Sequence, residues 1–405
     1  MRILWVRGAK IVPVRSGGQI LSYYHVRELA RRHEVTVLSF YRAGKLDPNY
    51  AGALERELPG CRFVHASPIL VRRERRNPLR LLDPKPSVMT RLASAEVAQT
   101  VRQWLEEGRC DVAVCDALSS AVNFMGGGTT PAVLLAHNVE TSLERSKAGQ
   151  ARHWLQRLVM QRAARRLEAY ESAKLQEFEH VVAVSAEDAA EMARLAGHGR
   201  VTAISTGVDL DEFAPAPPAV DAPPLVVFVG MMSYLPNVDA ARWFCSEIWP
   251  QIVAAVPGAR FRIVGRTPTP EVRALASDTV EVTGTVPSVA EHMAQASVVV
   301  EPLRAGGGTR LKIYQGMAMA RATVSTTLGA EGLDVHDGQD IVLADGADAF
   351  AAAVIALLRD KGRRSAIGVA AAAQAALYGW AAVSVEFERI LEGVVAGAAK
   401  RAGPE

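Results

Sequence analysis

Short apolar runs alternate with amphipathic stretches along most of the chain. Two such runs, Arg2–Val6 and Glu34–Phe40, flank a stretch whose apolar residues recur every three or four positions from Ile20 to Ala30. A short apolar run is typical of a buried strand, and the wider spacing is typical of an amphipathic helix. The pattern therefore predicts a βαβ unit at the start of the chain.

The same alternation continues along the chain and predicts further strands with helices between them, in two series. Strands that alternate with helices in this way form mostly parallel, doubly wound sheets. The remaining predicted strands are Arg62–Ala66, Asp111–Cys115, Ala132–Ala136, His180–Val184, Leu225–Val229, Arg260–Val264, Val280–Thr283, Ser297–Val300, Thr323–Thr326 and Ile341–Ala344.

A long helix is predicted over Ala151–Glu179. Its apolar residues from Trp154 to Phe178 recur at helical spacing, and arginines occupy the positions between them. We interpret the apolar stripe mostly as a core face and the arginines mostly as a solvated face.

A proline-rich segment, Ala214–Pro224 (APAPPAVDAPP), divides the predicted elements into two groups. Because 405 residues exceed one ordinary core, two domains are expected. We predict a first Rossmann-like domain over 1–213, a linker over 214–224 and a second Rossmann-like domain over 225–377. A last helix over 378–405 is expected to return to the first domain. The predicted fold class is α/β, with two doubly wound parallel sheets and a cleft between them for two substrates.

Composition excludes several classes of protein. The hydrophobic content of 49% with 22% charged residues is globular, and the formal net charge of +3 argues against a dedicated nucleic-acid binder. The four cysteines form no CxxC pair, so we expect reduced thiols rather than metal ligands. A strand pattern begins at Met1, so no signal peptide is expected, and no apolar run approaches the ~18 residues of a membrane span. We expect a cytoplasmic protein that contacts the inner face of the membrane, if at all, only at its surface.

A glycine-rich segment between a strand and a helix is the strongest candidate for an anion site. Three consecutive glycines, Gly306–Gly308, are followed by Thr309, Arg310 and Lys312. Glycines allow close approach of a ligand, and a helix start offers N–H groups and a positive dipole end to a phosphate. The alternative is a strand-to-helix turn with a solvated basic face.

Two further segments follow predicted strands in the first half. Ser16-Gly17-Gly18 is either a loop that approaches a ligand at the carboxyl end of a strand or a tight turn. His137-Asn138-Val139-Glu140 comes directly after the strand Ala132–Ala136, where chemistry is often placed. His137 is therefore a candidate functional residue, and hydrogen-bonded scaffolding is the alternative.

Arginines and leucines are interleaved over Leu70–Leu92. This stretch could meet anionic lipid headgroups or a lipid-linked acceptor. The alternative is a solvated, proline-broken loop.

Taken together and in order, these segments resemble the GT-B glycosyltransferases of retaining family 4, in the branch associated with exopolysaccharide and cell-envelope sugar transfer. The resemblance covers essentially the whole chain. It rests on the segments SGG, HNVE, AVSAED, TGVDLDEF, VFVGMMSYLPNVDAARWF, FRIVGR, GTVPSV, EPLRAGGGTRLKIYQGMAMA and VSTTLGAEGL.

The resemblance implies roles for particular residues. The nucleotide base of a sugar donor would lie near Gly284, Thr285 and Val286. His137 would lie beside the transferred sugar, and Glu331 is the preferred partner of its hydroxyls, with Glu301 and Asp209 as other candidates. The diphosphate would meet Gly308, Thr309, Arg310 and Lys312, and Gly17 and Gly18 would face the donor phosphates or the acceptor.

The sequence departs from the family pattern at four positions. Two glutamates of many relatives correspond to Gly307 and Gln315, and an arginine and a lysine correspond to Met231 and Asn237. An amide accepts hydroxyl hydrogen bonds without charge assistance, so Gln315 would weaken donor binding by roughly 1–2 kcal/mol. Arg310 and Lys312 would then carry most of the positive charge at the phosphates.

The implied activity is transfer of a sugar, with retention, from a nucleotide-diphosphate-sugar donor to a hydroxyl of a glycan or lipid-linked acceptor. His137, Arg310 and Lys312 would be its catalytic residues, with no cofactor and no obligatory metal. Two alternatives stay open, a sugar-nucleotide epimerase and a non-catalytic homologue that binds nucleotide-sugar.

Overall fold

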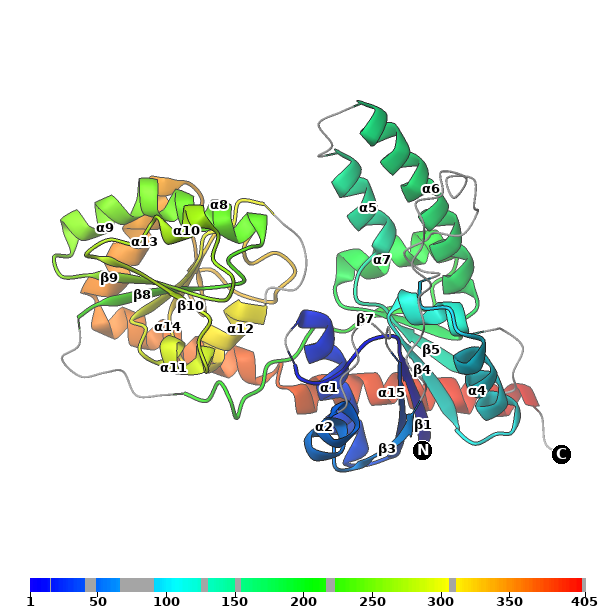
Figure 1. Ribbon diagram of the computed structural model, residues 1–405. Helices are drawn as coiled ribbons and strands as arrows, with labels where there is room; N and C mark the ends of the chain where they lie inside the picture. Colours follow the sequence, from blue (N-terminus) through cyan, green and yellow to red (C-terminus); the bar gives the residue numbers. More distant parts are fainter. Residues whose placement is uncertain are drawn as a thin grey trace. The chain divides into compact units, whose positions relative to one another are not determined.

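The computed structural model describes residues 1–14, 16–40, 49–65, 91–124, 130–149, 154–215, 223–305 and 311–402. They form two compact units, Met1–Ser205 with Val383–Glu405, and Thr206–Ala382. Each unit is built around its own parallel sheet, of seven strands in the first and six in the second (Figure 1). The predicted α/β class with two Rossmann-like sheets is confirmed.

The sheet of the first unit has the order β3-β2-β1-β4-β5-β6-β7, and every neighbouring pair is parallel. The chain runs outward from β1 through β2 to β3 and then crosses to β4 on the other side of β1. The sheet therefore has a topological switch point between β1 and β4, where ligands of open α/β sheets usually bind. Its strands are β1 (Arg2–Arg7), β2 (Glu34–Ser39), β3 (Cys61–His65), β4 (Val112–Asp116), β5 (Ala132–Leu135), β6 (His180–Ala183) and β7 (Val201–Ala203).

Helices surround this sheet, because its strands are apolar on both faces and need cover on both. Side chains of α4, α6 and α7 join the core on one face. The helices of the unit are α1 (Gly17–Ala30), α2 (Tyr50–Glu57), α4 (Ala95–Glu106), the 3₁₀ helix η3 (Leu118–Asn123), α5 (Glu140–Gly149), α6 (Trp154–Gln176), α7 (Ala186–Ala196) and α15 (Trp380–Ala402).

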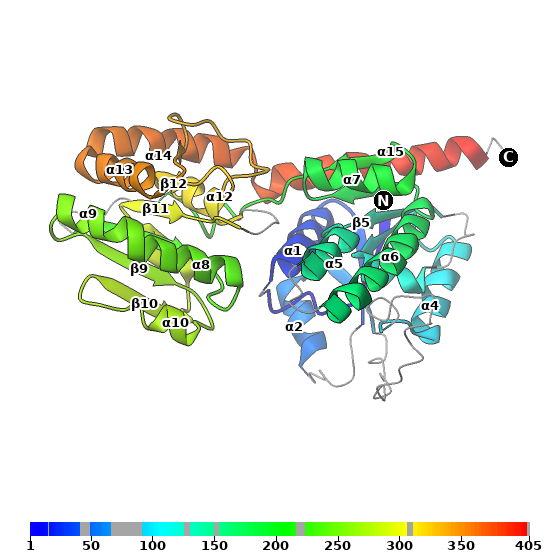
Figure 2. The same ribbon diagram turned by 90° about the horizontal axis from the view of Figure 1, so that it is seen from above.

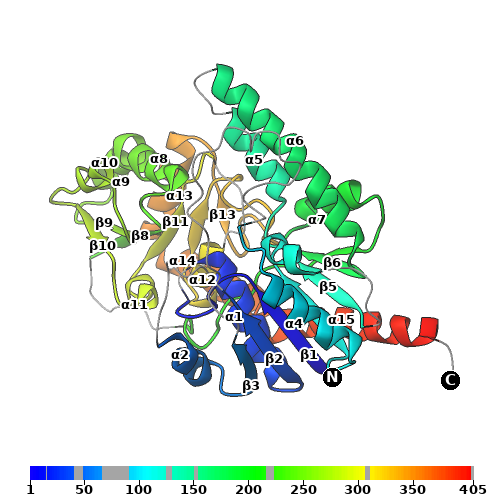
Figure 3. The ribbon, with the colours of Figure 1, turned by 45° about the vertical axis from the view of Figure 1, so that its right-hand side comes forward.

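The helix α6 lies within the predicted range 151–179, but the apolar stripe interpreted mostly as a core face is buried only in its C-terminal part. Leu167 and Leu175 are buried, whereas Trp154, Leu158 and Val159 are 74%, 59% and 45% exposed. The first turns of α6 extend beyond the sheet beside α5, as Figures 1 and 3 show. Helical spacing identifies a face of a helix, but it does not show where along the helix the domain ends.

The second unit has the strand order β10-β9-β8-β11-β12-β13, again all parallel. Its switch point lies between β8 and β11, since the chain runs outward from β8 to β10 before crossing. Figure 1 shows α8, α9 and α13 over one face of the sheet and α11, α12 and α14 over the other. The strands are β8 (Leu225–Val229), β9 (Arg260–Val264), β10 (Val280–Gly284), β11 (Val298–Glu301), β12 (Thr323–Ser325) and β13 (Val342–Leu343). The helices are α8 (Leu235–Trp243), the π-helical η4 (Phe244–Ile248), α9 (Trp249–Ala255), α10 (Pro270–Arg273), α11 (Val289–Ala294), α12 (Leu311–Ala318), α13 (Ala347–Arg359) and α14 (Lys361–Ala376).

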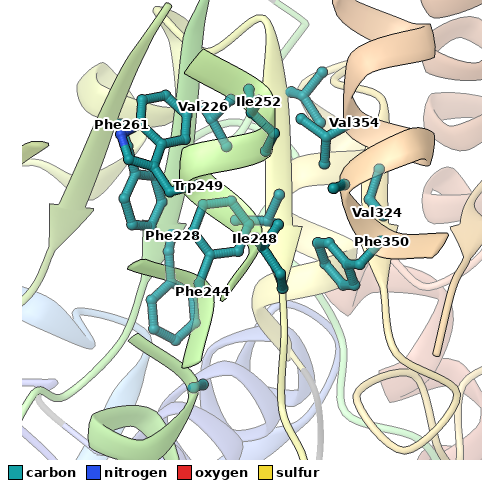
Figure 4. Packing of buried hydrophobic residues seen from close by; sticks show 14 of the residues in the cluster. Val226, Phe228, Phe244, Ile248, Trp249, Ile252, Phe261, Val324, Phe350 and Val354 are labelled. Carbon is teal, nitrogen blue, oxygen red and sulfur yellow. The ribbon is translucent and has the colours of Figure 1, made fainter. Parts of the chain in front are cut away.

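Aromatic side chains fill the core on the first of these faces. Phe244 lies against Phe261, with ring centroids 4.4 Å apart, and against Trp249 and Phe350 at about 6 Å (Figure 4). This cluster joins η4 and α9 to β9 and α13, so it fixes the sheet from which the loops of the second unit project.

Two glycines bring the loops after β8 and β9 into contact at the carboxyl edge of this sheet. Gly265 has φ +154°, and a Cβ there would lie 1.6 Å from the carbonyl oxygen of Gly230. No other residue fits this contact, because only glycine has no Cβ. The contact holds the start of the β8–α8 loop next to the switch point.

The last helix, α15, packs on the first unit (Figure 2). Glu388 forms an ion pair with Arg32 and a hydrogen bond with His33, and Phe387 packs against the rings of Trp5 and His25. The described boundaries differ slightly from the predicted ones: residues 206–213 group with the second unit, and the return to the first begins at Val383. The reason lies in the backbone, because the Val208 N–H donates to Tyr378 and the Trp380 N–H donates to Val208.

Candidate functional site

Lys312 is the centre of a charged cluster at the switch point of the second unit. It lies in the first turn of α12, and its Nζ donates to Oε1 of Glu301 at 2.7 Å and to Oδ1 of Asn237 at 3.4 Å. Glu301 ends β11, Asn237 follows β8, and the Phe228 ring of β8 lies 5.1 Å from the ammonium group. The two strands that flank the switch point thus place one cation at the edge where α/β folds bind ligands.

The geometry leaves this cation able to bind an anion. The Glu301 side chain is 3% exposed and the Lys312 side chain 25% exposed, so the carboxylate is the buried partner and the lysine reaches solvent. An ammonium group has three N–H donors, and the structure assigns two of them to Glu301 and Asn237. The remaining donor and the N-terminal N–H groups of α12 can serve an anion.

Other predicted donor residues of the second unit lie at the same edge of the sheet. Gly284 ends β10 with φ +72°, and the exposed Thr285 and partly buried Val286 follow it. Gln315 is partly buried on α12, and Glu331 is exposed in the loop after β12. Predicted residues that lie outside the described part of the chain are Gly307, Gly308, Thr309 and Arg310.

The other residues singled out in this unit are engaged as follows. Met231 is 41% exposed, and its carbonyl accepts a hydrogen bond from the Asn237 amide. Asp209 accepts hydrogen bonds from the backbone N–H groups of Asp211 and Glu212, so it stabilises its own turn. Glu301 is committed to Lys312 rather than exposed to a sugar.

Asp116 is the centre of a second cluster, at the switch point of the first unit. It ends β4, is fully buried, and accepts hydrogen bonds from Trp5 Nε1 at 2.8 Å and Arg7 Nη1 at 2.7 Å, both on β1. His137 Nε2 lies 2.7 Å from the same oxygen, Oδ1, that Arg7 binds. Arg7 also donates to the hydroxyl of Ser22 on α1. The cluster joins β1, β4, α1 and the loop after β5.

The charges of this cluster keep Asp116 ionised. Burial alone raises the pKa of Asp116, but the positive charge of Arg7 and the contact with His137 outweigh it, so the net pKa lies well below its ordinary value. Nearby, burial lowers the pKa of His25 to about 3, so that imidazole is neutral at pH 7. The cluster around Asp116 thus contains two charged groups, the Asp116 carboxylate and the Arg7 guanidinium, which form an ion pair.

An ionised Asp116 also sets the tautomer of His137. Because a carboxylate only accepts, His137 Nε2 must carry the hydrogen that it shares with Asp116. In the neutral ring Nδ1 is then the acceptor, and it faces α1: a Cβ on Gly18 would lie 2.7 Å from it. The His137 side chain is 12% exposed, so the ring is fixed yet reaches the surface.

Two family models match the chain. The model described as Glycosyltransferase Family 4 matches residues 15–212, and the model described as Glycosyl transferases group 1 matches residues 223–360. The chain belongs to the GT-B glycosyltransferases. The described parts of this glycosyltransferase contain no helix long and apolar enough to cross a membrane. Nor do they bring three or more His, Cys, Asp or Glu side chains together as metal ligands.

Similar proteins support the same family and fold. A phosphatidyl-myo-inositol mannosyltransferase of Mycolicibacterium smegmatis is 31% identical over 217 residues, which is 49% of this chain and only 55% of that protein. Sucrose-phosphate synthase from Thermosynechococcus elongatus has a TM-score of 0.68 at 16% identity, over 98% of this chain and 100% of the other. The Anabaena protein HepE, solved with UDP, has a TM-score of 0.64 at 14% identity over 97% and 100%. The last two likenesses show the fold.

Asp116 and Arg7 were missed in the sequence analysis, although a signal for both was present. Each is the polar residue that directly follows a predicted apolar strand, which is the same position relative to its strand that made His137 a candidate. What the sequence could not show is the strand order, which places β1 beside β4. Of the residues predicted in the first half, Gly18 and His137 are in contact, whereas a Cβ on Gly17 would meet no atom within 4 Å.

The difference between the two glycines gives a matched pair of variants. We expect Gly18→Ala to lower sugar transfer by about 100-fold, because the new methyl group displaces the His137 ring, and displacements of about 1 Å cost rates of this order. Gly17→Ala should keep the position of His137, as monitored by its NMR chemical shift. Wild-type activity and an unshifted His137 resonance in Gly18→Ala would contradict the assignment.

Proposed function

We propose that this glycosyltransferase moves a sugar from a nucleotide-diphosphate-sugar donor to a hydroxyl of a glycan or lipid-linked acceptor, with retention at the anomeric carbon. The observation that carries the proposal is the Lys312 cluster at the switch point of the second unit, where a cation stands at the start of a helix. Such an arrangement stabilises the negative charge that develops on a departing diphosphate. The chemistry needs this stabilisation more than it needs a strong base.

The other roles are part of the same proposal and are supported by the family membership. Lys312 acts with Arg310 and with Gly307, Gly308 and Thr309 on the diphosphate. Gly284, Thr285 and Val286 meet the base, and Gln315 the ribose. Glu331 binds hydroxyls of the transferred sugar, and no obligatory metal or other cofactor takes part.

In the first unit, the proposal places His137 beside the transferred sugar and Gly17 and Gly18 near the donor phosphates or the acceptor. Asp116 and Arg7 orient the imidazole so that Nδ1 is available as an acceptor. Asp116 and Arg7 are positioning residues, since they act through His137.

The relatives suggest the classes of donor and acceptor. HepE has been solved in complex with UDP-glucose, and the mycobacterial relative is named for mannosyl transfer to phosphatidyl-myo-inositol. We propose retention and a role in polysaccharide or cell-envelope glycoconjugate synthesis, and the resemblance to retaining family 4 enzymes supports both. We place the reaction on the cytoplasmic side of the membrane.

The test is a donor panel. The purified chain is incubated with UDP-, GDP- and ADP-sugars, with and without a membrane extract as acceptor source, and release of nucleoside diphosphate is measured. We expect release from at least one donor, stimulated by the extract, and NMR of the product should show the anomeric configuration of the donor. Donor binding without turnover would support a non-catalytic homologue instead. Interconversion of UDP-GlcNAc without acceptor would support an epimerase.

A further inference from the structure

The end of the α5–α6 hairpin in the first unit carries apolar side chains that point to solvent. On α6, Trp154 is 74% exposed, Leu158 59% and Val159 45%. Isolated exposed apolar residues are common on protein surfaces, but three large ones within the first two turns of one helix are not. They indicate a surface that binds something.

The same surface is strongly basic. Residues 154–166 contain four arginines and no aspartate or glutamate. Within the described part of the chain, no carboxylate pairs with Arg157, Arg162 or Arg165. By contrast Arg145, on α5, forms an ion pair with Glu168 at 2.8 Å.

Helical geometry places the apolar and basic residues together. Trp154, Leu158, Arg162 and Arg165 are separated by four, four and three residues, so they lie on one face of α6. At 1.5 Å per residue, Arg162 lies about 12 Å behind Trp154 along the helix. The face therefore begins with apolar groups at the end of the hairpin and continues with cations.

We propose that the end of the α5–α6 hairpin (Trp154, Leu158 and Val159, with Arg157, Arg162 and Arg165) docks on the surface of an anionic lipid bilayer. Trp154 and Leu158 enter the boundary between headgroups and acyl chains, where aromatic and aliphatic side chains of interfacial helices are found. The arginines bind lipid phosphates, and their long side chains reach the headgroups while the helix stays inclined.

A second copy of the chain fits this surface less well than a bilayer. A two-fold contact would bring the same helix face of two molecules together. Arg157, Arg162 and Arg165 of each copy would then approach one another, with no carboxylate in residues 154–166 to compensate them. An anionic membrane supplies the missing negative charge.

The hairpin is joined directly to the candidate site. The buried Glu171 of α6 accepts hydrogen bonds from the backbone N–H groups of Glu140 and Thr141, which begin α5 just after His137. A bilayer that holds the hairpin therefore also holds the loop that carries His137. We infer that this contact helps a lipid-linked acceptor to reach the site, and this part of the inference rests on the proposed function. The membrane contact itself does not rest on it.

The experiment is flotation of the full chain with lipid vesicles. We expect binding to vesicles of phosphatidylcholine with phosphatidylglycerol, weaker binding to phosphatidylcholine alone, and a decrease as salt rises. The double variant W154E/L158E should lose at least ten-fold in partitioning. Each arginine of the face replaced by glutamine should cost about five-fold on the anionic vesicles only.

Matched controls come from the second unit, where Val369 and Leu377 are each 64% exposed. The variant V369E/L377E should bind vesicles like the wild type. Loss of binding in this control, or full binding by W154E/L158E, overturns the proposal. Binding that is lost only when Arg72 and Arg73 are replaced also overturns it, because the contact would then lie in the basic stretch Leu70–Leu92. The proposal is also overturned if the wild type does not float with vesicles but forms a dimer, and W154E/L158E is a monomer. The surface would then bind a second copy of the chain.

The experiment distinguishes failure of the membrane contact from failure of the proposed function. Donor hydrolysis in solution, without acceptor, should be the same in W154E/L158E and the wild type. Failed flotation with normal donor hydrolysis overturns only the membrane contact, and failed hydrolysis with normal flotation overturns only the proposed function.

Discussion

Replacing Lys312 by methionine should lower donor turnover by about 100- to 1000-fold, the usual effect of removing one group that stabilises developing negative charge. The physical reason is the position of its ammonium group at the switch point of the second sheet, at the start of α12. Methionine keeps most of the side-chain volume over the Phe228 ring but has no charge. The measurement is the rate of nucleoside-diphosphate release from the donor that the panel identifies.

The obvious objection is that Lys312→Met also removes one cation from the buried Glu301. Breaking a buried ion pair from one side costs about 3–5 kcal/mol, whereas replacing both partners by neutral groups costs far less. The double variant Lys312→Met/Glu301→Gln should therefore recover thermal stability toward that of the wild type. Its turnover should stay low, because the charge that faces the diphosphate is still missing.

This pair of variants separates catalysis from folding. If the double variant recovers both stability and turnover, Lys312 only neutralises Glu301 and its assignment to the diphosphate fails. Lys312→Arg is a further control, since it keeps the charge but changes the shape of the donor group. We expect partial activity from it, and full loss of activity would indicate that the compact ammonium group is needed.

The sequence predicted the fold well because the strands are apolar on both faces. Runs such as Leu225–Val229 and Arg260–Val264 coincide with β8 and β9 as observed. Parallel strands buried on both faces need continuous apolar residues, so their pattern is hard to mistake. The candidate site was harder to predict from the sequence, because Arg7, Asp116 and His137 are brought together by the order of the strands in the sheet and not by their order in the sequence. The position of α6 relative to its core was also not predictable from the spacing, which is why Trp154 was included in a stripe interpreted mostly as a core face.

The Lys312 cluster and the Asp116 cluster share an arrangement that the sequence motifs do not show. In each, a buried carboxylate at the end of a strand beside the switch point holds a basic side chain: Glu301 holds Lys312, and Asp116 holds Arg7 and His137. A buried ion pair contributes little net stability, since its attraction must first offset the loss of hydration. Its value lies in holding a long or rotatable side chain in one place, and this is what a binding site needs.

Replacing Asp116 by asparagine should lower sugar transfer by roughly 100-fold, although Asp116 is fully buried and is proposed to act only through His137. The carboxylate forces His137 to carry its hydrogen on Nε2. An asparagine amide can instead donate to Nε2, and the hydrogen then moves to Nδ1, the atom that faces Gly18 and the solvent. Nδ1 of His137 then donates a hydrogen bond where it accepts one in the wild type.

The decisive measurement is the tautomer of His137, read from ¹⁵N chemical shifts of the imidazole. The wild type should show hydrogen on Nε2 and Asp116→Asn a mixture or the opposite tautomer, a change that a purely structural role would not produce. Trp5→Phe is the control, because it removes the hydrogen bond to Oδ2 and leaves Oδ1 to Arg7 and His137. It should lose stability but keep both the tautomer and most of the activity.

A double variant again separates loss of activity from loss of folding. Asp116→Asn alone leaves the buried Arg7 uncompensated, so the double variant Arg7→Met/Asp116→Asn should be the more stable of the two. Sugar transfer should stay low in both, because neither fixes the imidazole. Wild-type transfer in a folded double variant would show that His137 acts without this support, and the positioning role of Asp116 would be wrong.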